Sequence, residues 1–188
     1  MHTLQTHCGP YTCQLLYRRA ATGRAAARDC LAEFGRQRGW PLSSADIINH
    51  THLSMAPAIK LSISHSRTLG VLAICETTEL AGIGVDVEFA SRPLRSGLAA
   101  RILNDHDDAG LAEDPLGLWL GKEAAFKAIV PLLSAERERP LLVTDLWLRD
   151  GGFGLCGESA PRGGLCGIAF HSDADAVRGA LAWVPARR

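Results

Sequence analysis

The sequence predicts an α+β protein made of two pseudo-symmetric halves, each a small antiparallel sheet packed with helices. The chain has 188 residues, of which 47% are hydrophobic, so it has room for one domain or two small halves with an ordinary core. Alternating and continuous apolar segments indicate strands, and the order strand, helix, strands is followed by strand, helices, strands. We place the boundary near residue 80, between an N-terminal half of residues 1–80 and a C-terminal half of residues 81–188.

The N-terminal half is expected to begin with a strand over residues 11–17. Residues 20–38 are rich in Ala and Arg, which favour the helical state, and Gly39 with Pro41 supplies a stop signal. Ser, His, Asn and Pro are frequent in residues 41–58, so this segment is expected to be an irregular connection.

Three apolar segments then predict strands at the junction of the two halves. Residues 59–65 alternate apolar and polar side chains, which is typical of a half-buried strand. Residues 69–75 form a continuous apolar run and are expected to pair with the preceding strand as a hairpin. Residues 83–88 alternate again, which indicates the first strand of the second half.

The rest of the second half is expected to contain two helices followed by strands. A short helix is predicted over residues 96–103, and an acidic, exposed stretch over residues 105–114. A longer helix over residues 116–130 ends at Pro131, because proline disrupts a helix interior. Further strands, separated by Gly, Pro and Asp turns, are predicted over residues 141–149, 153–156, 165–171 and 179–184.

Composition excludes several function classes. Lys plus Arg and Asp plus Glu are 20 each, so there is no basic surplus of the kind that indicates a nucleic-acid-binding protein. No apolar run is long enough to span a membrane, and no export signal is visible at the N-terminus. The six cysteines form no Cys-x-x-Cys pair, so we expect reduced thiols in a cytoplasmic protein.

The strand at the start of the second half carries two acidic residues. In Gly84-Val-Asp-Val-Glu88, alternation places Asp86 and Glu88 on one face, about 7 Å apart. Two carboxylates this close repel unless a cation lies between them, and hard oxygen ligands suit Mg²⁺ or Mn²⁺ rather than zinc. The same alternation is also typical of an exposed strand face whose carboxylates are merely solvated.

The predicted helix over residues 116–130 carries Glu123 and Lys127 one turn apart on one face. Such a pair is ordinarily a surface ion pair. It can instead supply a third carboxylate to a metal ion and a cation to a phosphate, provided that this face lies against the strand of Asp86 and Glu88.

A third motif, Ser62-Ile-Ser-His-Ser66, places Ser62 and Ser64 on the polar face of a strand and His65 near its end. Hydroxyl groups and an imidazole at a strand end are good hydrogen-bond donors to phosphate, although a lone histidine is more often structural. No Gly-x-Ser-x-Gly, phosphate-binding Gly-rich loop or dinucleotide-binding glycine pattern is present.

The three motifs, in this order, resemble those of the 4′-phosphopantetheinyl transferase superfamily, in particular its monomeric, surfactin-synthetase-activator type. The family patterns are Ser-His-Ser, Gly-[Ile/Val]-Asp-[Ile/Val]-Glu and [Trp/Phe]-x-x-Lys-Glu-[Ala/Ser]-x-x-Lys-Ala. The second and third stand here as Gly84–Glu88 and Trp119–Ala128. The segment from Gly23 to Arg28 is similar to the family's Gly-Arg-x-x-x-Arg helix. The resemblance covers nearly the whole chain.

This resemblance implies transfer of 4′-phosphopantetheine from coenzyme A to a serine of an acyl or peptidyl carrier protein, with adenosine 3′,5′-bisphosphate as the second product. It implies Mg²⁺ or Mn²⁺ bound by Asp86, Glu88 and Glu123. It further implies catalytic roles for Glu123, Lys127 and His65. The expected coenzyme A contacts are Arg24, Arg28, Ser64, His65, Lys122 and Lys127.

The expected partners are the carrier protein and coenzyme A, with no nucleic acid and no membrane, and the chain is expected to act as a monomer because it supplies both halves. Carrier proteins are acidic, so Arg92, Arg95 and Arg101 are candidates for docking. Two alternatives remain open: a Mg²⁺-dependent phosphohydrolase that uses the same residues with water, and a non-catalytic relative that acts as a binding module.

Overall fold

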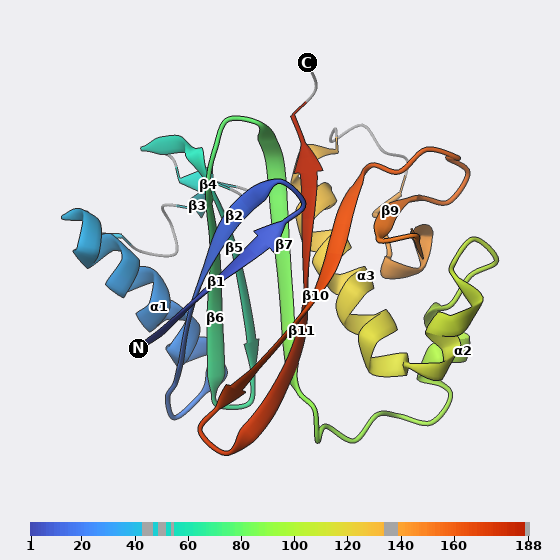
Figure 1. Ribbon diagram of the computed structural model, residues 1–188, viewed down its shortest axis with the longest axis horizontal. Coiled ribbons are helices and arrows are strands. Elements are labelled where there is room, and N and C mark those ends of the chain that lie inside the picture. The colour runs from blue at the N-terminus through green and yellow to red at the C-terminus, as the bar shows by residue number, and fades with distance from the viewer. Residues whose placement is uncertain (43–46, 49–51, 54, 134–138, 187–188) are drawn as a thin grey trace.

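The computed structural model describes residues 1–42, 47–48, 52–53, 55–133 and 139–186, and it shows an α+β protein with two antiparallel sheets (Figure 1). The first sheet has the strand order β1-β2-β6-β5, continued by the two-residue strands β4 and β3. The second sheet has the order β7-β11-β10-β9-β8. The first sheet therefore uses strands up to residue 76, and the second begins at residue 80.

The first sheet and its helix come from the N-terminal part of the chain. The helix begins where Thr22 accepts a hydrogen bond from the Ala25 N–H (3.2 Å), and it ends at Gly39, whose φ of 71° is a left-handed conformation that glycine adopts readily. The elements are β1 (His2–Cys8), β2 (Tyr11–Arg19), α1 (Gly23–Arg38), β3 (Ile47–Ile48), β4 (His52–Leu53), β5 (Ala56–Ser66) and β6 (Leu69–Glu76).

The second sheet and the remaining helices follow. The longest of these helices begins at Pro115, and the Asp114 side chain caps it by accepting from the Gly117 N–H (3.0 Å). The elements are β7 (Leu80–Phe89), α2 (Leu98–Ile102), the 3₁₀ turn η2 (Ala109–Glu113), α3 (Pro115–Ile129), the 3₁₀ turns η3 (Val130–Leu132) and η4 (Val143–Asp145), β8 (Leu146–Arg149), β9 (Gly152–Leu155), β10 (Gly163–Ser172) and β11 (Asp175–Pro185).

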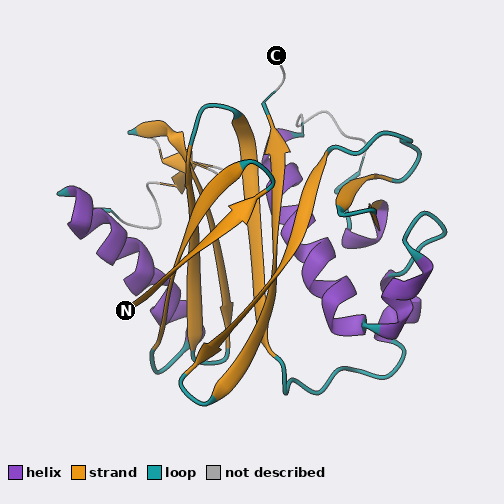
Figure 2. Cartoon of the chain, viewed as in Figure 1, coloured by secondary structure: helices purple, strands orange, loops and turns teal. Residues whose placement is uncertain are grey.

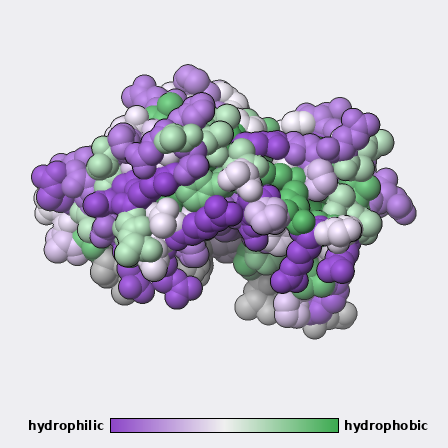
Figure 3. Space-filling view, turned by 90° about the horizontal axis from the view of Figure 1, so that it is seen from below, coloured by the Kyte–Doolittle hydropathy of each residue, from purple (hydrophilic) through white to green (hydrophobic). Residues whose placement is uncertain are grey.

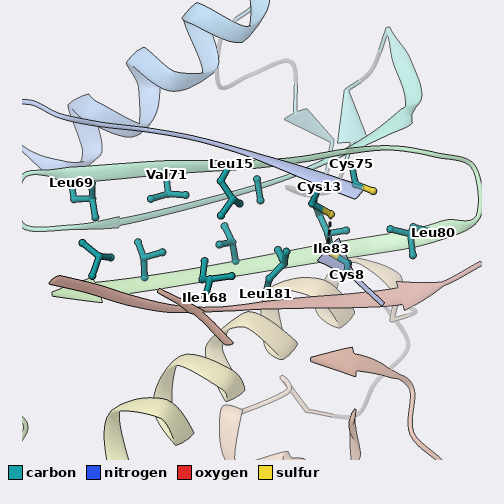
Figure 4. Packing of buried hydrophobic residues seen from close by; sticks show 14 of the residues in the cluster. Cys8, Cys13, Leu15, Leu69, Val71, Cys75, Leu80, Ile83, Ile168 and Leu181 are labelled. Atoms are coloured by element: carbon teal, nitrogen blue, oxygen red, sulfur yellow. Dashed lines mark hydrogen bonds between the residues drawn. The ribbon is translucent and has the colours of Figure 1, made fainter. Parts of the chain in front are cut away.

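The two sheets pack face to face and share one hydrophobic core. Leu69 and Val71 of the first sheet point toward the second sheet and belong to the same cluster as its Ile83, Ile168 and Leu181 (Figure 4). Helix α1 covers the outer face of the first sheet, and α3 covers the outer face of the second, so helices lie on both sides of the paired sheets (Figure 2). Among the described residues, no helix has both the length and the apolar character needed to cross a membrane.

Each long helix approaches its sheet most closely at a glycine. A Cβ added at Gly70 of β6 would lie 2.0 Å from the Ala27 N atom of α1, and one added at Gly84 of β7 would lie 2.0 Å from the Ala124 O atom of α3. No side chain fits in such a space, so these two glycines set the helix-to-sheet distance in the two halves. This close approach at Gly84 brings Asp86 of β7 within hydrogen-bonding distance of Lys127 of α3.

The predicted strands over residues 11–17, 59–65, 69–75 and 83–88 are confirmed by β2, β5, β6 and β7, and the predicted helices by α1, α2 and α3. In the segment expected to be irregular, residues 41–58, the described part contains β3, β4 and the first residues of β5, while residues 43–46, 49–51 and 54 lie outside the described residues. In the second half, β8 begins at Leu146, later than predicted.

The strand β1 was not predicted, and one expectation about exposure was wrong. Asp107, in the acidic stretch expected to be exposed, has a side chain that is 0% exposed because it pairs with Lys122 inside the protein.

Candidate functional site

The functional motifs meet where β5 of the first sheet lies beside β7 of the second. No backbone ladder joins these two strands. Instead, the N–H groups of Val85 and Val87 donate to the hydroxyl oxygens of Ser62 (3.0 Å) and Ser64 (3.2 Å). The alternating serines of β5 therefore satisfy backbone donors on the edge of β7, and they fix the position of the strand that carries the acidic residues.

Asp86 is held between a serine and a lysine. The Ser64 hydroxyl donates to Asp86 Oδ1 (2.7 Å), and Lys127 Nζ donates to the same oxygen at 2.7 Å and to the Val85 carbonyl at 3.0 Å. The Asp86 side chain is 15% exposed and that of Lys127 is 30% exposed, so this ion pair is largely shielded from water. The predicted approach of α3 to β7 is thus present at Lys127.

Glu123 lies one helical turn before Lys127 and is half-buried. Burial raises the pKa of Glu123, the nearby charge of Asp86 raises it further, and Lys127 acts in the opposite direction. Within the described residues, no protein donor forms a hydrogen bond with Glu123. The negative charges of Asp86 and Glu123 therefore repel one another across the α3–β7 contact, and Lys127 offsets part of this repulsion.

Glu88 lies in a different environment. Its Oε1 atom accepts from the Ser66 hydroxyl and from the Phe89 N–H (3.0 Å), and its Oε2 atom accepts from the Arg92 guanidinium. The Glu88 side chain is 8% exposed. Both of its oxygens are engaged by groups of the protein itself.

The resemblance implies a divalent ion between Asp86, Glu88 and Glu123, and these residues fit that implication only in part. Among the residues that the structure describes, no three His, Cys, Asp or Glu side chains are arranged to hold a metal. Asp86 and Glu123 suit such an ion, because they are partly buried carboxylates: burial raises the pKa of Glu123, and the charge of Asp86 raises it further. Glu88 does not, since it is already neutralised by Arg92.

His65 lies at the end of β5 and opens onto a cavity of about 420 Å³. Its side chain is exposed. The positive groups around this cavity are Arg67, from the turn after β5, and Arg92, from the loop after β7. The cavity is lined by His65, Ser66, Arg67, Glu88, Arg92 and Pro93.

A second cavity, of about 310 Å³, adjoins the first through Arg92 and Pro93. Three arginines and several apolar side chains line it: Arg92, Pro93, Leu94, Arg95, Leu98, Arg101 and Trp119. The loop after β7 leads to the lower end of the molecule (Figure 1), which Figure 3 shows from below. There, hydrophilic surface surrounds a hydrophobic patch in the indentation between the larger and smaller parts of the molecule.

The N-terminal turn of α1 lies against the His65 end of β5. The Gly23 N–H donates to the Arg67 carbonyl, and a Cβ added at Gly23 would lie 3.1 Å from the His65 Cβ atom. Arg24 follows directly and is exposed, as is Arg28 one turn further along the helix. The structure therefore brings the start of α1 to the first cavity, and Arg24 is closer to it along the helix than Arg28.

Lys122 is excluded from phosphate binding by its position. Its side chain is 0% exposed, and its Nζ atom donates to Asp107 Oδ2 (2.6 Å) and to the carbonyls of Ile102 (2.6 Å) and Leu146 (2.8 Å). An ammonium group has three donors, and all three are used here. The expected coenzyme A contact at Lys122 is thus corrected: this lysine joins α3 to α2 and β8.

Sequence reasoning missed one contact in this region, the pairing of Glu88 with Arg92, because the sequence suggests only a docking role for Arg92. Ser66 and Arg67 follow His65 and line the first cavity. Neither residue type at a strand end distinguishes a ligand contact from an ordinary turn. The spacing of four residues between Glu88 and Arg92 was the available signal.

The sequence matches no protein-family model, and no curated protein matches it. The functional interpretation therefore depends on the motifs and on the geometry described above.

Proposed function

We propose that this protein transfers 4′-phosphopantetheine from coenzyme A to a serine of an acyl or peptidyl carrier protein. The serine oxygen forms a bond with the phosphorus nearer to the pantetheine group, and the bond from that phosphorus to the bridging oxygen breaks. The leaving group is adenosine 3′,5′-bisphosphate. The motif resemblance suggests this reaction, and the contacts around Asp86 support it.

The observation that carries the proposal is the meeting of Asp86, Glu123 and Lys127 at the contact between β7 and α3. A surface ion pair between Glu123 and Lys127 was the alternative, but Lys127 instead bonds to Asp86 and to the backbone of β7. Side chains from distant segments thus come together in one half-buried place, which is what a diphosphate-binding centre requires.

Asp86 and Glu123 are the residues that would hold Mg²⁺ or Mn²⁺. Such an ion would neutralise charge on the diphosphate and on the leaving phosphate. A second hydrogen bond, to the Val85 carbonyl, holds Lys127 next to these carboxylates. Lys127 therefore provides a fixed positive charge toward the transferred phosphoryl group.

We assign to Glu123 the acceptance of the proton from the carrier serine, directly or through water. Without a bound ion, burial and the charge of Asp86 raise the pKa of Glu123. Ser64 contributes indirectly, because its hydroxyl both donates to Asp86 and accepts from the Val87 N–H.

We assign the binding of the two substrates to the two cavities. The first, with His65 and Arg67 and with Arg24 on the adjacent helix start, suits phosphate groups of coenzyme A. The second, with Arg95, Arg101 and apolar side chains, suits an acidic helical carrier protein. The two adjoin, as a reaction between a bound nucleotide and a docked protein requires.

Mass spectrometry on a panel of apo carrier proteins incubated with coenzyme A and Mg²⁺ tests the proposal. The expected result is a gain of one phosphopantetheine on at least one carrier, with bisphosphate released only when that carrier is present. Glu123→Gln should abolish the gain. Bisphosphate release without carrier would favour the phosphohydrolase, and coenzyme A binding with no product under either condition would favour a binding module.

A further inference from the structure

The carboxylate of Glu88 is saturated by groups of the protein. Ser66, the Phe89 N–H and Arg92 donate to it, and both of its oxygens are used. Asp86 differs in this respect: its contacts are to Oδ1, and no donor of the described residues reaches Oδ2. A divalent ion could therefore bind Asp86 without displacing a protein group, whereas at Glu88 it would have to break an ion pair.

Arg92 is held by Glu88 in a way that leaves most of its donors available. The residue lies four positions after Glu88, and its N–H donates to the Phe89 carbonyl (3.0 Å), which closes the turn that returns its side chain to Glu88. The hydrogen bond from Arg92 to the Glu88 carboxylate uses its Nη1 atom. Guanidinium has five N–H donors, and within the described part of the chain the others meet no side-chain acceptor.

Arg92 also has a special position, because it lines both cavities. Its side chain is 46% exposed, while the Glu88 side chain that holds it is 8% exposed. A buried carboxylate thus fixes an exposed guanidinium at the boundary between the phosphate-binding cavity and the cavity for the carrier. An arginine in such a place presents a planar set of donors to an anion that enters from either side.

We propose that Glu88 is a positioning residue for Arg92 rather than a ligand of the divalent ion, and that Arg92 binds a phosphate group of the donor substrate at the boundary of the two cavities. This inference rests on the proposed function. The ion then has Asp86 and Glu123 as its protein ligands, and Arg92 acts together with Arg67 and His65 in the first cavity. The ligand class at Arg92 is a phosphate ester or diphosphate.

Metal binding and coenzyme A binding, measured separately by calorimetry on the purified chain, test the two parts of this inference. For Mn²⁺ without nucleotide, Glu88→Gln should keep the affinity within about twofold of wild type, whereas Asp86→Asn should lose it by about tenfold or more. For coenzyme A without a divalent ion, Glu88→Gln and Arg92→Gln should each weaken binding by about tenfold, the size of one charge-assisted hydrogen bond.

The double variant Glu88→Gln/Arg92→Gln should bind coenzyme A no more weakly than Arg92→Gln alone, because Glu88 acts through Arg92. Arg92→Lys should restore part of the lost affinity, since it keeps the charge but not the planar fork. Arg149→Gln, an exposed arginine of β8 outside both cavities, is the matched control and should leave both affinities unchanged.

Loss of Mn²⁺ affinity in Glu88→Gln to the extent seen in Asp86→Asn would overturn the inference, as would additive losses of coenzyme A affinity in the double variant. If Glu88→Gln does not fold, Arg92→Gln still decides the matter: unchanged coenzyme A affinity in that variant would contradict the assigned role. Failure of the proposed function would give a different result: coenzyme A would bind normally, but no carrier would be modified.

Discussion

Lys127 Nζ lies 2.7 Å from Asp86 Oδ1 and 3.0 Å from the Val85 carbonyl oxygen, so one side chain of α3 binds both the side chain and the backbone of β7. The helix and the strand come from segments about forty positions apart in the chain. This contact links the second and third sequence motifs directly. Lys127 thereby holds Asp86 against the helix that also carries Glu123.

Replacing Lys127 with Met should lower kcat/KM for carrier modification by about 100-fold, because one preorganised positive group that stabilises the transition state is removed. Steady-state kinetics with a validated carrier measures this effect. Lys60→Met is the matched control: Lys60 lies on β5 and donates to the Pro57 carbonyl (2.8 Å), so the same chemical change there should alter kcat/KM less than twofold. Comparable losses in the two variants would contradict the role of Lys127.

Replacing Lys122 with Met should destabilise the fold by about 3–5 kcal/mol, because it leaves the Asp107 carboxylate buried without its counter-charge. The free energy of unfolding from urea titration measures the loss. Coenzyme A affinity of the folded fraction should stay at the wild-type value. A weakened affinity with unchanged stability would instead return Lys122 to the phosphate-binding residues.

Replacing Gly84 with Ala should destabilise the protein by about 1–3 kcal/mol or more, since the added methyl group would lie 2.0 Å from the Ala124 carbonyl oxygen and must push α3 away from β7. Such a shift also separates Glu123 and Lys127 from Asp86, so activity should fall further than stability explains. Gly167→Ala in β10 is the control, because nothing lies within 4 Å of a Cβ there. Equal unfolding free energies for the two variants would show that the close helix contact is not required.

Reversing the charge of the second cavity with Arg95→Glu and Arg101→Glu should raise the KM for an acidic carrier and leave the KM for coenzyme A unchanged. Both arginines are exposed and line the cavity beside Trp119. The effect should shrink at high ionic strength, because exposed charges are screened. Arg149→Glu is the control of equal charge change. Unaltered turnover at sub-saturating carrier would place the docking surface elsewhere.

Local patterns predicted the elements that carry the chemistry. The two-residue alternation along β5 and β7 is visible in the sequence alone, and it correctly placed Asp86 and Glu88 on the same strand. The helical spacing of Glu123 and Lys127 likewise correctly placed them on one helix. The strand β1 could not be predicted in this way, because it lies at the edge of its sheet and its mostly exposed or half-buried side chains show little apolar alternation.

The partners of the charged residues could not be predicted in the same way. Whether Lys127 pairs with Glu123 or with Asp86, and whether Glu88 meets a metal or Arg92, depends on how α3 and the loop after β7 pack against β7. The burial of Lys122 against Asp107 is a further example, because an acidic, polar segment carries no local sign that one of its carboxylates points inward.

Replacing Glu123 with Gln should abolish carrier modification and at the same time stabilise the protein at neutral pH. Burial and the charge of Asp86 raise the pKa of Glu123 in the folded state, so the folded protein binds a proton more readily than the unfolded chain does. By linkage, this group favours folding at low pH, and its ionisation costs stability as the pH rises through the raised pKa. Gln removes that cost, so thermal unfolding should show a higher Tm for the variant at pH 7 and no difference below about pH 4, where the carboxyl is protonated in both states.

Adding Mn²⁺ should raise the Tm of the wild type and not that of the variant, because only the wild type offers two carboxylates to the ion. A variant that is inactive but less stable than wild type at neutral pH would mean that Glu123 serves the fold, and the assignment of this residue to proton transfer and metal binding would then be wrong.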